Sequence, residues 1–373
     1  VSILFRHLTV AQLSALRAGA SGWRWRINMF FGLDLFSFEL THELVGSGRF
    51  LRTDDQATFV CNLLEFIFSC CTRLRILSIP FYLRGSAAHI LQKFRSPELQ
   101  ILDLTIENTD EAFALPPNCL TDAGYNLRAL ILDFIDAPTN MESVWETVAI
   151  HCQSLETLRL NFYFMSMSDT CEAAKLALFA YVLRMRTLRS LDLRFPFPNL
   201  ADFEITPEAN LERLHLEDFI LEPPGHVWHH AAFLCYLLPM YTNLKHLMLG
   251  VVCHSGVVDI ITKSCTRLIA LYVSVDYYGR TPITGRMRWL LKKLAEKSDS
   301  DNAVVKWLPI LETLELGEQN RLSSLEQDLL EKVKRARPNL EVDFNGDTIV
   351  DIFDSVDFVY LEIADLVWKR YDY

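Results

Sequence analysis

The sequence has no excess of positive charge and no long apolar run. Its 47 Asp and Glu outnumber its 36 Lys and Arg, so the formal net charge is −11. Nucleic acids and anionic membranes both attract a basic face, so this balance argues against either as a partner. A membrane span needs roughly 20 apolar residues. The best candidate, 231–240, is about half that length and predicts a buried helix instead.

Motifs for catalysis and for metal binding are also missing. His42 and Glu43 open like a zinc-protease motif, but Gly46 stands where the second His is required. No G-x-S-x-G sequence occurs, so a hydrolase nucleophile has no candidate. One cluster of histidines could share a metal: His226, His229 and His230. No Cys or carboxylate stands at ligand spacing to complete the set, so the cluster is better explained as the start of a helix than as a metal site. The sequence therefore predicts a non-enzymatic protein with no cofactor and no metal.

The cysteines show no pairing pattern. There are nine, an odd number, and none forms a C-x-x-C pair. A large chain of this kind is typical of reduced, intracellular proteins of the cytoplasm or nucleus. The absence of any N-x-[ST] acceptor site agrees with this expectation.

The sequence does contain a short repeated pattern of apolar residues, L-x-x-L-x-L, which we call the frame. Residues 155–160 read Leu-Glu-Thr-Leu-Arg-Leu and return almost unchanged at 311–316 as Leu-Glu-Thr-Leu-Glu-Leu. Ile79 and Val273 replace the third Leu in two of the nine copies of this L-x-x-L-x-L frame, which are spaced 23 to 43 residues apart. The copies start at Leu74, Leu99, Leu127, Leu155, Leu188, Leu211, Leu244, Leu268 and Leu311. Such recurrence is the signature of a leucine-rich repeat.

The frame predicts an α/β fold, a leucine-rich-repeat solenoid shaped as a curved horseshoe. Side chains alternate along a strand, so the second and third Leu point to one side and stack into ladders in a parallel sheet. Strands would line the concave face, and helices the convex face. We expect degenerate repeats and a cap over 1–73, repeats over 74–344, and a capping helix over 345–373. The clearest helices are expected near 140–152, 169–186, 227–240, 284–297 and 324–337.

The two ends are expected to depart from the repeat. Trp23, Trp25, Ile27 and Met29 alternate with polar residues, which predicts a strand in the N-terminal cap. Residues 36–53 are expected to be irregular. Residues 338–344 predict a last strand with a changed frame.

Candidate binding residues occupy the third, fifth and seventh places of the frame, which the fold would leave exposed on the concave sheet. They are densely charged and of mixed sign near the middle of the array. We expect a protein partner to contact Arg159, Asn161, Asp192, Arg194, Arg213, His215, Glu217, His246 and Tyr272. The alternative is that any solvated sheet face is polar without binding anything.

Aromatic residues follow many of the strands, for example Phe81, Tyr82, Phe134 and Phe219. They either pack beneath the loops or form an exposed rim of the kind that protein interfaces use.

Three copies of the frame also carry a cysteine three residues earlier: Cys71, Cys152 and Cys265. This common position marks them as packing residues where a helix returns to a strand. The pattern resembles cysteine-containing leucine-rich repeats, which are common in F-box proteins, and the uneven spacing resembles the fungal set of these proteins. Residues 4–10 are similar to the segment that often follows the F-box there. The resemblance implies an F-box upstream of Val1 that binds a cullin-type ubiquitin-ligase adaptor, while the repeats hold a protein substrate.

Three hypotheses follow. The first is the substrate-binding part of an F-box-type ubiquitin-ligase receptor. The second is a stand-alone leucine-rich-repeat binder or inhibitor of a basic protein, with no ligase role. The third is an enzyme with a site near His215, His246 and Tyr272, for which the fold itself supplies no chemistry.

Overall fold

A computed structural model of the chain describes the greater part of the frame. The described residues are 26–29, 36–39, 74–83, 96–106, 120, 126–136, 148, 150–164, 170–194, 207–217, 233–250, 255–273, 286–296, 306–316 and 324–343. The chain divides into two compact units, Val1–Leu188 and Arg189–Tyr373. The capping helix expected over 345–373 lies outside the described residues.

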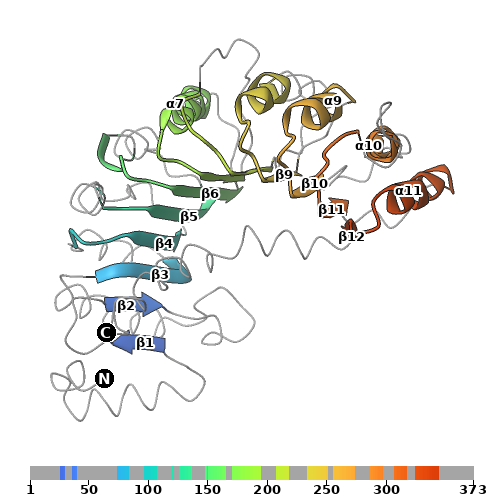
Figure 1. Ribbon diagram of the computed structural model, residues 1–373. Coiled ribbons are helices and arrows are strands. Elements are labelled where there is room, and N and C mark those ends of the chain that lie inside the picture. The colour runs from blue at the N-terminus through green and yellow to red at the C-terminus, as the bar shows by residue number, and fades with distance from the viewer. Residues whose placement is uncertain are drawn as a thin grey trace, which may run out of the picture. The chain divides into compact units, whose positions relative to one another are not determined.

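The first unit is built on a row of strands with one helix after the last of them (Figure 1). Strands β1 and β2 are antiparallel, and each later strand runs parallel to the one before it. The elements are β1 (Arg26–Met29), β2 (Phe36–Glu39), β3 (Leu74–Leu83), β4 (Ile101–Ile106), β5 (Ala129–Asp136), β6 (Thr157–Phe164) and α7 (Thr170–Arg184). Strand β1 confirms the alternation that predicted it, whereas β2 contradicts the irregular segment expected from residue 36 onward.

The second unit repeats the plan with strands that are parallel throughout the described pairs. Its strands are β7 (Ser190–Arg194), β8 (Arg213–Glu217), β9 (His246–Gly250), β10 (Ala270–Val273), β11 (Thr313–Leu316) and β12 (Glu341–Asp343). Its helical elements are η2 (Leu238–Met240), α9 (Ser255–Ser264), α10 (Arg286–Ala295) and α11 (Ser324–Ala336). Strand β12 confirms the last strand that the sequence predicts. Apart from the antiparallel β1–β2 pair, the described pairs of the α/β chain are thus side-by-side parallel strands.

The frame leucines form the core of both units. In the first, Leu102, Leu130 and Leu158 stand opposite one another in register, and all are buried. In the second, an equivalent ladder is formed by Leu191, Leu214, Leu247, Leu271 and Leu314. Burying each Leu contributes roughly 1.5–3 kcal/mol, so the ladders are the main source of stability.

Successive strands begin with the same main-chain junction. The carbonyl at the second place of one frame accepts hydrogen bonds from the second and third N–H groups of the next. Glu156 N and Thr157 N donate to Arg128 O over 2.8 and 3.0 Å, and Glu212 N and Arg213 N donate to Arg189 O over the same distances. No side chain takes part, so the junction recurs whatever residue stands there.

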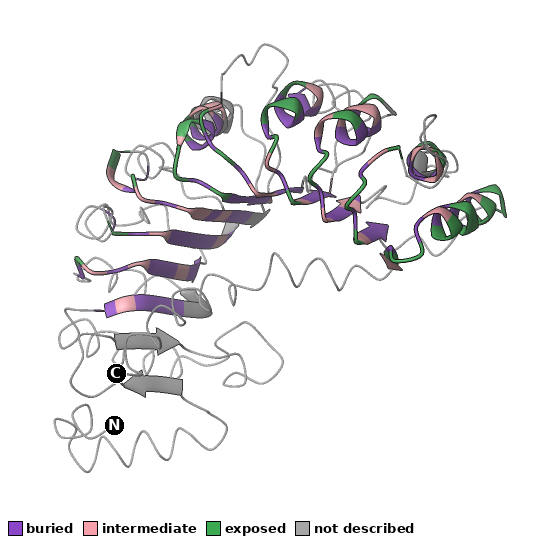
Figure 2. Ribbon diagram, viewed as in Figure 1, coloured by how far each residue is buried: buried purple, intermediate pink, exposed green. Residues whose placement is uncertain are grey.

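The helices cover one side of the strands. In the second unit, α9, α10 and α11 follow one another along that side (Figure 1). Figure 2 shows their buried residues turned toward the strands and their exposed residues turned away. Helices α7, α10 and α11 confirm their expected positions to within two residues, and residues 233–237 are helical as expected.

Helix α9 is not among the clearest helices that the sequence predicts. Its run Val257, Val258, Ile260, Ile261 and Thr262 is β-branched, which favours strands in an isolated sequence. The side chains of Val257, Val258 and Ile261 are buried, so tertiary packing outweighs that local preference. Among the described residues, no helix has both the length and the apolar character needed to cross a membrane.

Candidate functional site

In the first unit, the candidate residues stand on β6. Arg159 Nε lies 3.5 Å from Asp133 Oδ1 of β5, and the two side chains are 12% and 13% exposed. Asn161 stands opposite Asp133 in register and is buried. The Arg159–Asp133 pair is therefore only slightly exposed to solvent, whereas the Asn161 side chain is fully buried.

In the second unit, Asp192 joins two other candidates. Arg194 donates from Nε and Nη2 to the two carboxylate oxygens of Asp192, over 3.1 and 3.0 Å. His215 Nδ1 lies 2.9 Å from Asp192 Oδ1 on the neighbouring strand. Both carboxylate oxygens of Asp192 accept from Arg194, and the imidazole of His215 lies against one of them, so the three side chains restrict one another's movement. We call Asp192, Arg194 and His215 the β7–β8 cluster.

The burial of this face corrects the sequence-based expectation. Asp192 and His215 are buried, and so is Glu315, although the fifth place of the frame was expected to be exposed. The register runs from His215 to Met248, Tyr272 and Glu315 on successive strands. Strands about 4.8 Å apart place a side chain against neighbours on both sides, which reduces its contact with water. Alternation predicts which face a residue takes, but not how much of that face solvent reaches.

The third place of the frame is buried in some copies, for example at Ser190 and Ala270, and partly exposed in others. Arg213 and His246 stand opposite each other there on β8 and β9, and both are half-buried. Burial, and then the positive charges of Arg213 and Lys245, lower the pKa of His246 to about 4. His246 is therefore neutral at physiological pH.

Tyr272 and Glu217 complete the candidate set. Tyr272 is half-buried on β10. Glu217 stands opposite Arg194 in register, and its side chain lies outside the described residues. The three residues of the enzymatic hypothesis come from β8, β9 and β10, and the strand of Met248 separates His215 from Tyr272. Two strand spacings place their main chains about 10 Å apart. Throughout the described ranges, no group of three or more His, Cys, Asp or Glu could hold a metal ion.

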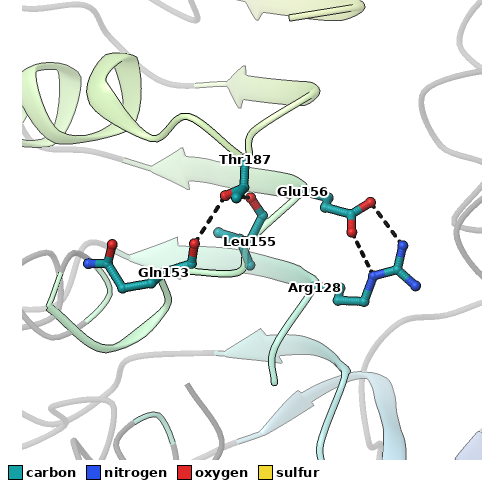
Figure 3. A network of polar contacts seen from close by, with 5 residues as sticks. All are labelled: Arg128, Gln153, Leu155, Glu156 and Thr187. Atoms are coloured by element: carbon teal, nitrogen blue, oxygen red, sulfur yellow. Dashed lines mark hydrogen bonds and ion pairs between the residues drawn. The ribbon is translucent and has the colours of Figure 1, made fainter. Parts of the chain in front are cut away.

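Sequence reasoning missed a set of polar contacts at the edge where the strands begin. Arg128 donates from Nε and Nη2 to Glu156 over 2.7 and 2.9 Å, and Thr187 Oγ1 donates to the carbonyls of Leu155 and Gln153 over 2.7 and 3.1 Å. Figure 3 shows this network in the first unit. Arg128 and Glu156 occupy the second place of their frames, so charges of opposite sign at that place could have predicted the pair.

The same edge of the second unit carries an equivalent chain. Lys245 Nζ lies 2.6 Å from Glu212 Oε2, and Asn243 links Asn210 to Arg267 over 2.9 and 2.7 Å. The hydrogen bond from Lys245 lowers the pKa of Glu212, the charges of Lys245, Arg189 and Arg213 add to this effect, and burial opposes it. Asn210, Asn243 and Arg267 each precede a frame Leu, and this shared place is the signal that would have found them.

Two of the three cysteines that precede the frame are packing residues, as predicted, and Cys71 lies outside the described residues. Cys152 and Cys265 are buried, and the carbonyl of each accepts a hydrogen bond from the first frame Leu, over 3.3 and 3.1 Å. Burial raises the pKa of each thiol to about 12, so neither is ionised at neutral pH. Phe134, whose side chain the structure describes, lies within β5 rather than after it and is buried, which favours core packing over an exposed rim for this residue.

Comparisons with known proteins give no family. The chain matches no family model, and no curated protein is similar enough to count as a relative.

Proposed function

We propose that this protein is an intracellular leucine-rich-repeat solenoid that recognises another protein through the strand face opposite its helices. We further propose that it is the substrate-binding part of an F-box-type ubiquitin-ligase receptor. One observation carries the first proposal: regularly spaced parallel strands hold side chains of mixed charge at fixed positions along one face. The resemblance of its cysteine-containing frames to F-box proteins supports the second.

The geometry favours an extended protein partner over a small molecule. In the second unit, the partly exposed residues form a row across three neighbouring strands: Arg213, His246 and Tyr272. A protein segment can contact such a row, and its charged groups can match both signs. The buried β7–β8 cluster gives the face a rigid base, so little side-chain entropy is lost on binding.

Recognition is tested with partners captured by crosslinking to the chain, then produced separately and measured as purified proteins. Arg213→Glu and Tyr272→Ala alter half-buried residues of the strand face and should weaken the affinity at least about tenfold. Lys334→Glu changes an exposed cation on α11 and should leave the affinity unchanged. A partner bound equally by all three variants does not use the strand face, and such a result for every purified partner refutes the proposal.

The ligase role is tested separately with the complete product of the gene. That product should capture the adaptor and cullin from purified components, and ubiquitin transfer to the bound partner should follow. Failure of capture, with strand-face binding intact, would leave a stand-alone binder or inhibitor. The chain's net charge of −11 favours a basic partner in that case.

A further inference from the structure

A basic and aromatic region on the helices stands apart from the acidic character of the chain. Helix α10 reads Arg-Met-Arg-Trp-Leu-Leu-Lys-Lys-Leu-Ala and contains no acidic residue. Lys306 and Trp307 lie in the segment that leads to β11. We call Arg288, Trp289, Lys292, Lys293, Lys306 and Trp307 the α10 patch. Its local positive charge is the reverse of the formal net charge of −11.

The two indole rings of the patch share one lysine. Lys293 Nζ lies 5.8 Å from the centre of the Trp289 ring and 5.0 Å from that of Trp307. Lys292 lies 5.9 Å from the Trp289 ring, and Lys306 lies 5.4 Å from the Trp307 ring. These distances are within the range of cation–π attraction, so the rings and ammonium groups order one another.

Hydrogen bonds fix both rings from neighbouring elements. Trp289 Nε1 donates to Asp259 Oδ1 of α9 over 3.3 Å, and Lys293 Nζ lies 3.5 Å from the same oxygen. Trp307 Nε1 donates to Glu296 Oε2 over 2.8 Å, and Lys306 N donates to Glu296 O over 3.1 Å. Asp259 and Glu296 are thus engaged within the patch, and the aromatic edges are held in defined positions.

The outer part of the patch faces solvent. Trp289 is 39% exposed, and Arg288, Lys292 and Lys306 are exposed beside it. Trp and Arg are the residues that most often dominate the binding energy of protein interfaces. A rigid exposed indole surrounded by cations presents an apolar contact and a positive field at the same place.

We propose that the α10 patch binds an acidic peptide segment of a partner protein, in which an apolar side chain contacts Trp289 while carboxylates meet Arg288, Lys292 and Lys306. Charge complementarity carries this choice of partner. A long polyanion such as a nucleic acid or an anionic membrane would also be repelled by the net negative charge of the chain. A short acidic segment is close only to the local basic region, so this repulsion is largely screened. This site lies on the helices, so it goes beyond the recognition proposed for the strand face.

The test uses the full chain and a fluorescein-labelled synthetic peptide of Asp and Glu with interspersed Phe and Leu. Fluorescence polarisation should show saturable binding that weakens at least about tenfold for Trp289→Ala and for the double variant Arg288→Glu/Lys292→Glu. Trp289→Phe should retain most of the affinity because it keeps an aromatic ring. The matched control Arg189→Glu, at a residue 65% exposed before β7, should bind like the wild type.

Three comparison ligands separate the possible partners. A peptide of the same charge with Gly in place of Phe and Leu should bind more weakly, because it lacks the apolar contact. A single-stranded oligonucleotide and phosphatidylserine vesicles should each bind more weakly than the acidic peptide. Tighter binding of either, with the same dependence on Trp289 and Lys292, would replace the peptide with a nucleic acid or a membrane and overturn the proposal.

The remaining outcomes are also decisive. Absence of saturable peptide binding, or equal binding by wild type and folded patch variants, refutes the proposal. Circular dichroism melting shows that each variant is folded, and the surface positions of Arg288, Trp289 and Lys292 make this the expected result. The strand-face variants Arg213→Glu and Tyr272→Ala should bind the peptide normally, which distinguishes failure of this site from failure of the proposed function.

Discussion

Arg337→Met should loosen the end of the second unit, because the Arg337 side chain joins three segments. Its guanidinium donates from Nε to the carbonyl of Leu294 over 3.1 Å and from Nη1 to that of Leu308 over 2.7 Å. Nη2 donates to the carbonyl of Trp307. The side chain is buried, and burial lowers its pKa to about 10, which leaves it charged at neutral pH. The end of α11 is thereby tied to the end of α10 and to the segment before β11.

The expected loss of stability depends on the hydrogen bonds of Arg337 that methionine cannot form. Each hydrogen bond from a charged donor contributes roughly 1.5–3 kcal/mol, but the cost of burying the guanidinium offsets part of that sum. We therefore expect Arg337→Met to reduce the free energy of unfolding by about 3 kcal/mol, since it leaves buried carbonyls without donors. Arg337→Lys should recover part of the loss, because a single ammonium cannot reproduce the planar fork.

Hydrogen exchange measured by mass spectrometry is the appropriate assay, since an array of repeats can unfold in parts. Peptides from α11 and β12 should exchange faster in Arg337→Met, while those from β4 to β6 should be unchanged. Lys334→Met, at a residue 49% exposed on the same helix, is the matched control and should change stability by less than about 0.5 kcal/mol. A loss below about 1 kcal/mol at Arg337, or loss of protection confined to the first unit, would refute the reasoning.

Three further predictions concern the frame and the residues beside it. Leu158→Asp places a carboxylate in the buried ladder and should abolish cooperative melting of the first unit by circular dichroism, whereas Leu158→Ala should cost about 2–5 kcal/mol; an unchanged melt would contradict the ladder. The pKa of His246 is about 4 in the folded state against 6.5 in the unfolded state, so only the unfolded state binds a proton between these pH values. The free energy of unfolding should therefore fall by about 2 kcal/mol as the pH drops from 7 to about 4.5. In His246→Gln the urea midpoint should no longer fall over this pH range, and a fall equal to that of the wild type would exclude His246 as its cause. Cys152 and Cys265 should react with maleimide on unfolding but not in the native protein, and rapid native labelling detected on tryptic peptides would contradict their burial.

The sequence predicts the parts of this fold that depend on spacing. Within each copy of the frame the apolar positions keep a fixed spacing. Leu155, Leu158 and Leu160 follow this spacing, and all three are buried as it predicts. Helix α11 was equally predictable, because Leu330 and Val333 lie on one face of a helix that begins at Ser324. In both cases, neighbours along the chain determine the outcome.

Contacts between distant residues could not be predicted in this way. The sequence places His215 on the polar face of a strand, but its burial depends on how closely Asp192 and Met248 flank it from other strands. Trp307 meets Lys293 across 14 positions of sequence, and no periodicity connects them. The ionic edge pairs, such as Arg128 with Glu156, occupy matching frame places and could have been found by aligning the copies with one another.

The main-chain junction between strands has a consequence for how such a chain can change. The shortest frame separation, from Leu188 to Leu211, and the longest, from Leu268 to Leu311, end in junctions of the same length, 2.8 Å for Glu212 N to Arg189 O and for Glu312 N to Ile269 O. Closing a longer loop adds little entropic cost, since that cost grows only with the logarithm of its length. Longer connections between strands can therefore be accommodated at little cost in stability, because the main-chain junction at the start of each strand stays the same.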